Sequence, residues 1–384
     1  MDEAVKYFSD HKDDVIKVMN RFLDGAEAVL EIVGETVPIC SVAIAVIRFA
    51  LDNQESSESE YVKNQLQKIS DKLNDVSENL TDIRKEIEKL GMDIKFSEVE
   101  ENIKGQFRKY MEILNEEPEY REKKVKRFKN HFSNTRGDGN LHELYEGVIG
   151  EGSIAILKTV LTYWEKNRRV VEDFCAHLKY LFVIGISALM VHTALENGDV
   201  SRQEKYWKEK METVELKMKS AVEDCINNFA AQAKIDTQKF LKYGYSEDLA
   251  DNLFSFLQKK YDWVYWAVRV YGQSDGWLTN LKLGRKYHSI VGESHFKFDD
   301  NCNVVVSYCV NPQPIDVRKI QQTFRESKKN RNMWKLAEHI HSEVPKCVIH
   351  AIRQNSKIYE KTNFPDDCYC HEQQKNCYLY VHSA

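Results

Sequence analysis

The stretch YLFVIGISALMV, from Tyr180 to Val191, runs for twelve residues without a charged side chain. A helix that spans a bilayer needs about twenty apolar residues, so this run is short for a constitutive membrane span. A helix that is apolar on all sides at the centre of a large helical bundle explains the same residues. We therefore predict a core helix over about 176–195.

A second interpretation of this stretch stays open. A core helix can be released into a membrane, as in helical pore-forming proteins, and a second apolar run at 39–47 would accompany it. In that case the helices 26–51 and 176–195 would convert to a lipid-inserted form. The candidate membrane-active residues are Tyr180, Leu181, Phe182, Val183, Ile184, Ile186, Leu189, Met190 and Val191.

A heptad pattern follows the polar connector at 52–60. Apolar residues alternate at spacings of four and three along a predicted coiled-coil helix that covers 61–115. They are Val62, Leu66, Ile69, Leu73, Val76, Leu80, Ile83, Ile87, Leu90 and Ile94. The phase then slips to a new stripe, Phe96, Val99, Ile103, Phe107, Tyr110 and Leu114, as at a stutter where the helix changes partner.

The rest of the chain divides into two regions of different character. Six prolines and sixteen glycines are few for 384 residues, which favours long helices. We predict a mainly α protein whose elongated helical bundle occupies 1–271, with an aromatic-rich helix at about 246–271. A smaller mixed α/β region, 272–384, should hold a hairpin in HFKF and VVVSYCV, a charged helix at 316–342, and strands in CVIHAIR and CYLYVHS.

Charge and cysteine content limit the setting. The 55 basic and 60 acidic side chains give a net charge of −5, which argues against nucleic acid as a partner. The first residues show no basic segment followed by an apolar one, so we expect no signal peptide. Nine scattered cysteines fit reduced thiols. We expect a cytoplasmic protein, with membrane association as the alternative.

Four residues near the end have the side chains of zinc ligands: Cys368, Cys370, His371 and Cys377. Their C-x-C-H-x₅-C spacing is not that of a standard zinc finger or ribbon, so they are weak metal candidates and free thiols or a disulfide are favoured. The pair His339 and His341, two residues apart, suits a strand and a surface position better than a metal site.

Two further motifs have simple interpretations. His177 lies four residues after Asp173 and near Glu172, which resembles half of a carboxylate metal site, but the apolar register favours a satisfied side-chain pair. The tripeptide Arg136–Gly137–Asp138 lies in SNTRGDGN, which we interpret as a loop. The motifs G-x-S-x-G, H-E-x-x-H, the P-loop and G-x-G-x-x-G after a strand are absent, so we expect no enzyme and no cofactor.

Several long segments resemble the fish rapunzel family. They are YVKNQLQKISDKLNDVSENLTDIRKEIEKL, IKGQFRKYMEIL, HFSNTRGDGNLHELYEGVIG, NRRVVEDFCAHLKYLFVIGISALM and FPDDCYCHEQQKNCYLYVHS. The resemblance covers the chain from about residue 26 to its end, and this family is similar in turn to a cephalopod salivary toxin. It implies a role in skeletal and fin growth, with interferon signalling in some relatives, and it assigns no catalytic or ligand residues.

Three functions follow as hypotheses. The first is a non-enzymatic helical protein of the rapunzel type. The second is a membrane-active, pore-forming-like protein. The third is an intracellular signalling adaptor that binds a protein partner, or itself, through outward positions of the coiled-coil helix such as Lys72 and Glu86.

Overall fold

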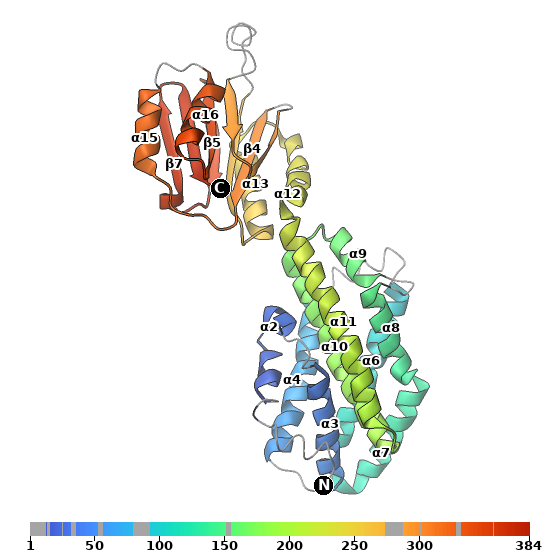
Figure 1. Ribbon diagram of the computed structural model, residues 1–384. Helices are drawn as coiled ribbons and strands as arrows, with labels where there is room; N and C mark the ends of the chain where they lie inside the picture. The colour runs from blue at the N-terminus through green and yellow to red at the C-terminus, as the bar shows by residue number, and fades with distance from the viewer. Residues whose placement is uncertain are drawn as a thin grey trace. The chain divides into compact units, whose positions relative to one another are not determined.

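The structure is a computed structural model in which two compact units are resolved by their internal packing (Figure 1). It describes residues 13, 16–24, 26–31, 36–52, 57–79, 93–150, 155–272, 287–299, 302–327, 332–355 and 357–384. Met1–Asn227 form what we call the helical unit, and Asn228–Ala384 form the sheet unit. The chain is thus mainly helical with a smaller C-terminal sheet region, as predicted.

The division between the units lies earlier in the chain than residue 271, where the sequence places it. The helices α12 (Phe229–Gln238) and α13 (Glu247–Lys260) belong to the sheet unit. Phe229 and Leu253 share one apolar core with Trp266 and Val268 of the first strand. Burial of these side chains against the sheet therefore assigns both helices to it.

The helical unit is built around one long helix, α10 (Arg168–Leu195). This helix contacts α2, α3, α4, α6, α8, α9 and α11. The surrounding elements are α2 (Ala26–Glu31), α3 (Thr36–Leu51), α4 (Ser57–Asn79), α6 (Asp93–Leu114), α7 (Pro118–Asn134), α8 (Gly137–Ile149), α9 (Ile156–Tyr163) and α11 (Val200–Asn227). The apolar run at 39–47 lies within α3, which also packs on α10.

The heptad pattern occurs on two packed helices. Val62, Leu66, Ile69 and Leu73 of α4 are buried, and so is the second stripe on α6, from Phe96 to Leu114. Both helices pack on α10. The predicted continuous coiled-coil helix is not confirmed, because residues 80–92, which hold the middle of the pattern, lie outside the described part of the chain.

The predicted loop around Arg136 is a tight corner instead. Helix α7 continues to Asn134 and α8 begins at Gly137, so only two residues connect them. Arg136 adopts a left-handed conformation with φ 63° and pairs with Glu143 at 3.0 Å. A Cβ on Gly137 would lie 2.7 Å from the ring of Phe132, so the corner requires glycine there.

The sheet unit contains two antiparallel four-stranded sheets. The first has the order β3-β4-β1-β6 and the second β2-β5-β8-β7. The strands are β1 (Tyr265–Tyr271), β2 (His288–Val291), β3 (His295–Phe298), β4 (Asn303–Cys309), β5 (Cys347–Arg353), β6 (Ile358–Thr362), β7 (Tyr369–Gln374) and β8 (Cys377–Ser383). Short 3₁₀ turns, η1 (Leu241–Tyr243) and η2 (Asp366–Cys368), complete it.

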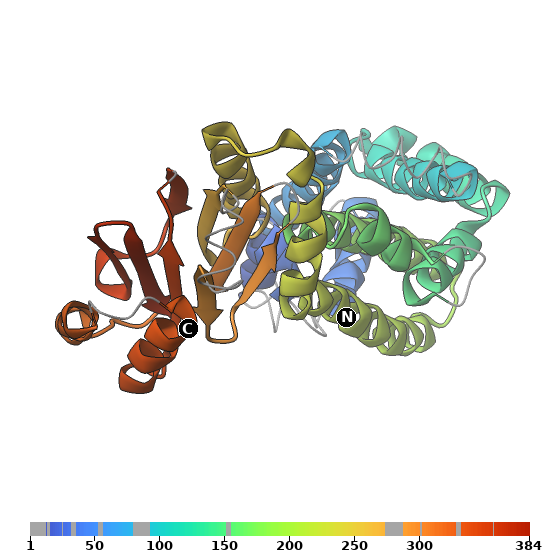
Figure 2. The same ribbon diagram turned by 90° about the horizontal axis from the view of Figure 1, so that it is seen from above.

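The two sheets face each other, and helices cover their outer faces (Figure 2). Val268 and Val306 of the first sheet pack against α12 and α13. Ile349 and Leu379 of the second pack against α15 (Val317–Glu326) and α16 (Met333–Glu343). The unit is a four-layer sandwich, with its two larger apolar cores on the outer sides of the sheets and smaller apolar clusters between them.

Several sequence predictions for this region are confirmed and three are wrong. The single charged helix expected at 316–342 is two helices, because α15 ends at Glu326 and α16 begins at Met333. The hairpin is β3 paired with β4, and CVIHAIR and CYLYVHS form β5 and β8. The helix expected at 246–271 ends at Lys260 and is followed by β1, because Trp266, Val268 and Val270 alternate with inward-facing residues at period two. His339 and His341 lie on the helix α16 rather than on a strand.

Candidate functional site

Helix α10 is the most deeply buried element of the helical unit. Every residue from Phe174 to Val191 is buried. Among the described residues, α10 alone is long and apolar enough to cross a membrane by length and composition, and the window that meets this criterion is wholly buried within the protein. All nine candidate membrane-active residues therefore lie in the core of the helical unit.

Both ends of α10 are fixed by local signals. The side chain of Asn167 accepts a hydrogen bond from the backbone N–H of Val170 and caps the first turn. At the other end Asn197 is left-handed, with φ 55°, and the N–H of Gly198 donates to Thr193 O at 2.8 Å. The helix boundaries thus follow from the sequence on either side of the apolar run.

Close approach of neighbouring helices requires a small residue in the middle of α10. A Cβ on Gly185 would lie 2.6 Å from Leu141 Cδ2 of α8 and 3.1 Å from Ile103 Cγ2 of α6. Glycine therefore allows both helices to pack against the α10 backbone, at a cost in helix propensity of about 1 kcal/mol.

The charge of Lys179 is satisfied inside the unit. Its ammonium lies 3.0 Å from Glu215 Oε1 of α11, and the two side chains are 1% and 2% exposed. The same ammonium donates to Val29 O of α2 at 3.0 Å. Thr36 of α3 donates its hydroxyl hydrogen to Glu215 at 2.8 Å. One buried ion pair thus joins four helices.

His177 takes part in a second buried pair. Its Nε2 lies 3.2 Å from Glu100 Oε2 of α6, with the side chains 1% and 3% exposed. The other oxygen of Glu100 lies 2.6 Å from Lys104 Nζ. The prediction of a satisfied pair therefore holds for His177, but its partner is 77 residues away rather than on the same helix.

Neutral polar groups of α10 are bonded to backbone oxygens. The Tyr180 hydroxyl donates to Phe22 O at 2.8 Å, and Ser187 donates to Val183 O at 2.7 Å. The thiol of Cys40 on α3 lies 3.3 Å from the same carbonyl, and burial raises its pKa to about 12. This thiol stays protonated at neutral pH.

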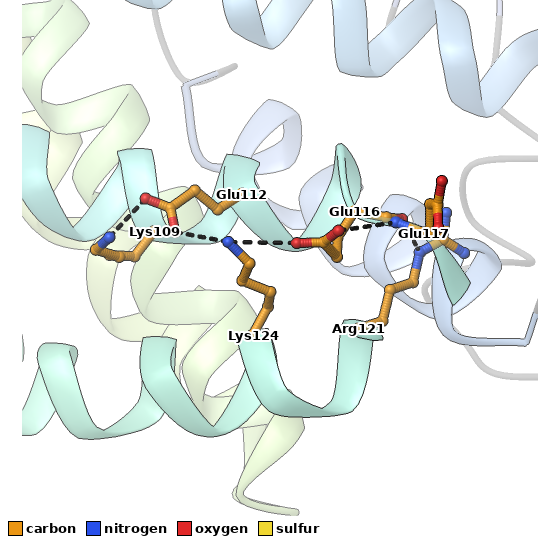
Figure 3. A network of polar contacts seen from close by, with 6 residues as sticks. All are labelled: Lys109, Glu112, Glu116, Glu117, Arg121 and Lys124. Carbon is orange, nitrogen blue, oxygen red and sulfur yellow. Dashed lines mark hydrogen bonds and ion pairs between the residues drawn. The ribbon is translucent and has the colours of Figure 1, made fainter. Parts of the chain in front are cut away.

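A surface network closes the corner between α6 and α7 (Figure 3). Lys124 of α7 lies 3.5 Å from Glu112 and 3.3 Å from Glu116, and Lys109 pairs with Glu112 at 2.5 Å. Arg121 donates to Glu116 O at 3.0 Å and reaches Ala50 O at the end of α3. The C-terminal end of α3 is thereby hydrogen-bonded to the corner between α6 and α7.

The four zinc-type residues do not converge. Cys370 and Cys377 lie in the apolar core beneath α15 and α16, whereas Cys368 packs with Phe364 and Cys309. The ring of His371 faces the other side of β7 and stacks on Tyr380 with centroids 4.5 Å apart. Within the described part of the chain, no three metal-ligand side chains come together. The Nδ1–H of His341 donates to Cys347 O at 3.1 Å.

Sequence reasoning missed the two carboxylates that anchor α10. Glu100 is four residues after Phe96 and three before Ile103, which are both buried. Glu215 has the same relation to Met211 and Met218 on α11. Each carboxylate therefore lies on an apolar helix face, and a charge at such a position indicates a buried partner.

Buried polar contacts hold α10 inside the helical unit. Lys179 and His177, which lie in the core, are paired with carboxylates of other helices, so α10 can leave the unit only when both contacts are broken. Removing one partner of such a pair costs about 3–5 kcal/mol.

Comparisons with known proteins agree on one family. The model of the family described as "Cephalotoxin-like middle helical domain" matches residues 52–245. A curated relative, "Protein rapunzel" of Danio rerio, is 32% identical over 191 residues, which cover 49% of this chain and 84% of the relative. No solved structure matches the chain significantly.

Proposed function

Because this chain belongs to the cephalotoxin-like family together with the rapunzel protein of Danio rerio, we propose that it is a non-enzymatic protein of the rapunzel type with a role in skeletal and fin growth. The observation that supports a non-catalytic role is the closed packing around α10, where Lys179 and His177 are both paired internally. The absence of the common catalytic motifs from the sequence supports it further.

A replacement experiment tests this role. The chain is expressed in zebrafish that lack rapunzel, and fin length and bone growth are measured. We expect growth to be restored by the natural chain and by Lys219→Met, whose partner Glu223 is an exposed neighbour on α11. We expect weaker restoration by Lys179→Met, which breaks the buried pair. A well-expressed natural chain that restores no growth would contradict the proposal.

A second candidate function is membrane insertion of α10. The observation that favours it is the combination of a helix of sufficient length and apolar composition with anchors that can be broken. Twenty-eight residues extend about 42 Å, more than the hydrocarbon core of about 30 Å. Lys179 lies next to the uncharged run, where its long side chain could reach the interface once Glu215 has released it.

Dye release from vesicles separates the two functions. Purified protein is added to vesicles with anionic lipid at pH 7.4 and pH 5, and membrane association is measured in parallel by carbonate extraction. Insertion predicts release that is faster for Lys179→Met than for Lys219→Met, because only the first variant weakens the anchoring of α10. Soluble protein and intact vesicles at both pH values, for the natural chain and both variants, would rule out insertion.

The exposed face of α4 is a candidate binding surface for a protein partner. On α4 the outward side chains Lys68, Asp71 and Lys72 are exposed, while Leu66 and Leu73 face the core. We propose that this face binds a partner or a second copy in the cytoplasm. Charge reversal by Lys72→Glu should then abolish capture of the partner without unfolding α4. Glu86, the other predicted contact, lies outside the described residues.

A further inference from the structure

The layer between the two sheets holds a buried polar network beside apolar side chains such as Val305 and Ile352, whereas the larger cores outside it are apolar. Along β1, Arg269 and Tyr271 point inward, whereas Val268 and Val270 point outward. Arg269 is fully buried. In the register it lies opposite Glu360 of β6. A buried guanidinium between two sheets needs hydrogen-bond acceptors, and histidine rings provide several of them.

One branch of hydrogen bonds runs from Arg269 toward β2. Arginine can only donate, so its Nη1 donates to His350 Nδ1 at 3.3 Å. The neutral ring of His350 therefore carries its hydrogen on Nε2, which donates to the Tyr271 hydroxyl at 3.2 Å. The Tyr271 hydroxyl in turn donates to His288 Nδ1 at 3.0 Å. Both histidines accept through one ring nitrogen.

A second branch leads from Arg269 to β8. Its Nη2 donates to Ser307 Oγ of β4. His382 Nδ1 must donate to Ser383 O, at 2.6 Å, because a carbonyl can only accept. His382 Nε2 is then an acceptor for the Ser307 hydroxyl at 2.8 Å. The two branches fix three histidines as neutral acceptors in bonds that cross or line the space between the sheets.

We propose that this inter-sheet network is an acid-sensitive latch, in which protonation of His288, His350 and His382 separates the two sheets. A protonated ring has no acceptor nitrogen, so each protonation breaks one of the bonds just described. At His350 it also places an imidazolium 3.3 Å from the Arg269 guanidinium. Two cations at this distance in a buried site repel each other strongly.

The groups around the network determine the direction of the pH response. They are Arg269 and Tyr271 on β1, Tyr287 just before β2, His295 and Lys297 on β3, Asp299 just after β3, Glu360 on β6, Tyr369 and His371 on β7, and Tyr380 on β8. Burial lowers the pKa of His288 to about 4 and that of His382 to about 3. Burial and the nearby Arg269 lower the pKa of His350 well below its ordinary value.

Because of these pKa shifts, the sheet unit loses stability as the pH falls. The three depressed pKa values stabilise the folded unit above about pH 6.5, and this stability is lost as the pH falls. Burial raises the pKa of Glu360 to about 7, which works in the opposite direction between about pH 4.5 and 7. Opening near pH 5.5 therefore takes up about three protons on the histidines and releases about one from Glu360.

Hydrogen exchange of the full chain, measured by mass spectrometry between pH 7.5 and 4.5 and corrected for the intrinsic exchange rate, tests the latch. We expect the opening constant of β1, β4, β5 and β8 to rise about 100-fold per pH unit between pH 6 and 5. His350→Gln keeps an acceptor for Arg269 and a donor for Tyr271 but cannot titrate. It should reduce the rise to about 10-fold per unit.

The matched control is His339→Gln on the exposed side of α16, which should keep the natural slope. If His350→Gln fails to fold, His382→Gln replaces it with the same expectation. A pH-independent opening constant of the natural chain, or a natural slope in the folded glutamine variant, would overturn the proposal. Titration of the ring signals by NMR gives an independent check, since protonation of these three histidines above pH 6 in the folded unit would also overturn it.

Discussion

Replacement of Lys179 by methionine is expected to destabilise the helical unit more than any surface charge change. Methionine preserves most of the side-chain length but removes the ammonium from its position 3.0 Å from Glu215. With an effective dielectric constant of about 20, the attraction lost at this distance is about 5.5 kcal/mol. Desolvation of the lysine is relieved at the same time, so the net loss expected for removing one partner is about 3–5 kcal/mol.

A double variant that changes both Lys179 and Glu215 tests why the single variant loses stability. Lys179→Met destabilises because it leaves the Glu215 carboxylate buried without its cation. Lys179→Met combined with Glu215→Leu removes both charges, and replacing a buried pair by apolar groups is often neutral or stabilising. We therefore expect the double variant to be within about 1 kcal/mol of the natural chain, which implies strong coupling between the two positions.

Hydrogen exchange of the α10 and α11 peptides measures these free energies in the full chain, without the assumption that two units unfold together. The control is Lys219→Met, which breaks a pair on the exposed face of α11 with an N···O distance of 3.9 Å and should leave protection unchanged. A loss below about 1 kcal/mol for Lys179→Met, or a double variant as unstable as the sum of the single changes, would refute the reasoning.

Three further predictions concern both units. Gly185→Ala should destabilise α10 by about 1–2 kcal/mol, because overpacking against Leu141 exceeds the gain in helix propensity. The double variant with Leu141→Ala should lose less stability than the sum of the two single losses. Asn167→Ala should lower the protection of the first turn of α10 by about 0.5–2 kcal/mol, whereas Asn167→Asp should retain it; equal protection in both would contradict a capping role. Glu360→Gln should stabilise the sheet unit by about 2–3 kcal/mol at pH 8 but not at pH 4. The folded protein keeps the Glu360 carboxyl protonated up to about pH 7, whereas the unfolded chain loses this proton near pH 4.5. Denaturant midpoints at the two pH values measure the difference.

Much of the helical unit could be predicted from local periodicity. The buried faces of α4 and α6 follow from residues such as Leu66 and Ile103 that recur at helical spacing. The uncharged run of α10 also predicted a core helix. The partners of its charges could not be predicted, because His177 and Glu100 are 77 residues apart and meet only through tertiary packing.

The sheet unit shows a different limit of sequence reasoning. The aromatic residues of the preceding helix region continue through Tyr265 and Trp266, so the segment reads as a continuation of that helix. Its alternation at period two was the signal for β1, since Val268 and Val270 pack outward while Arg269 points inward. The four zinc-type residues do not form a site, because neighbours in sequence such as Cys370 and His371 face opposite sides of one strand.

The central claim is that α10 is a core helix held inside the helical unit. The most direct measurement is hydrogen exchange of the peptides that cover Phe174–Val191, in buffer alone and with anionic vesicles. The claim predicts that in buffer these amides exchange only through opening of the whole helical unit, and are as protected there as with lipid. Rapid exchange in buffer, with protection that develops only when vesicles are added, would contradict it.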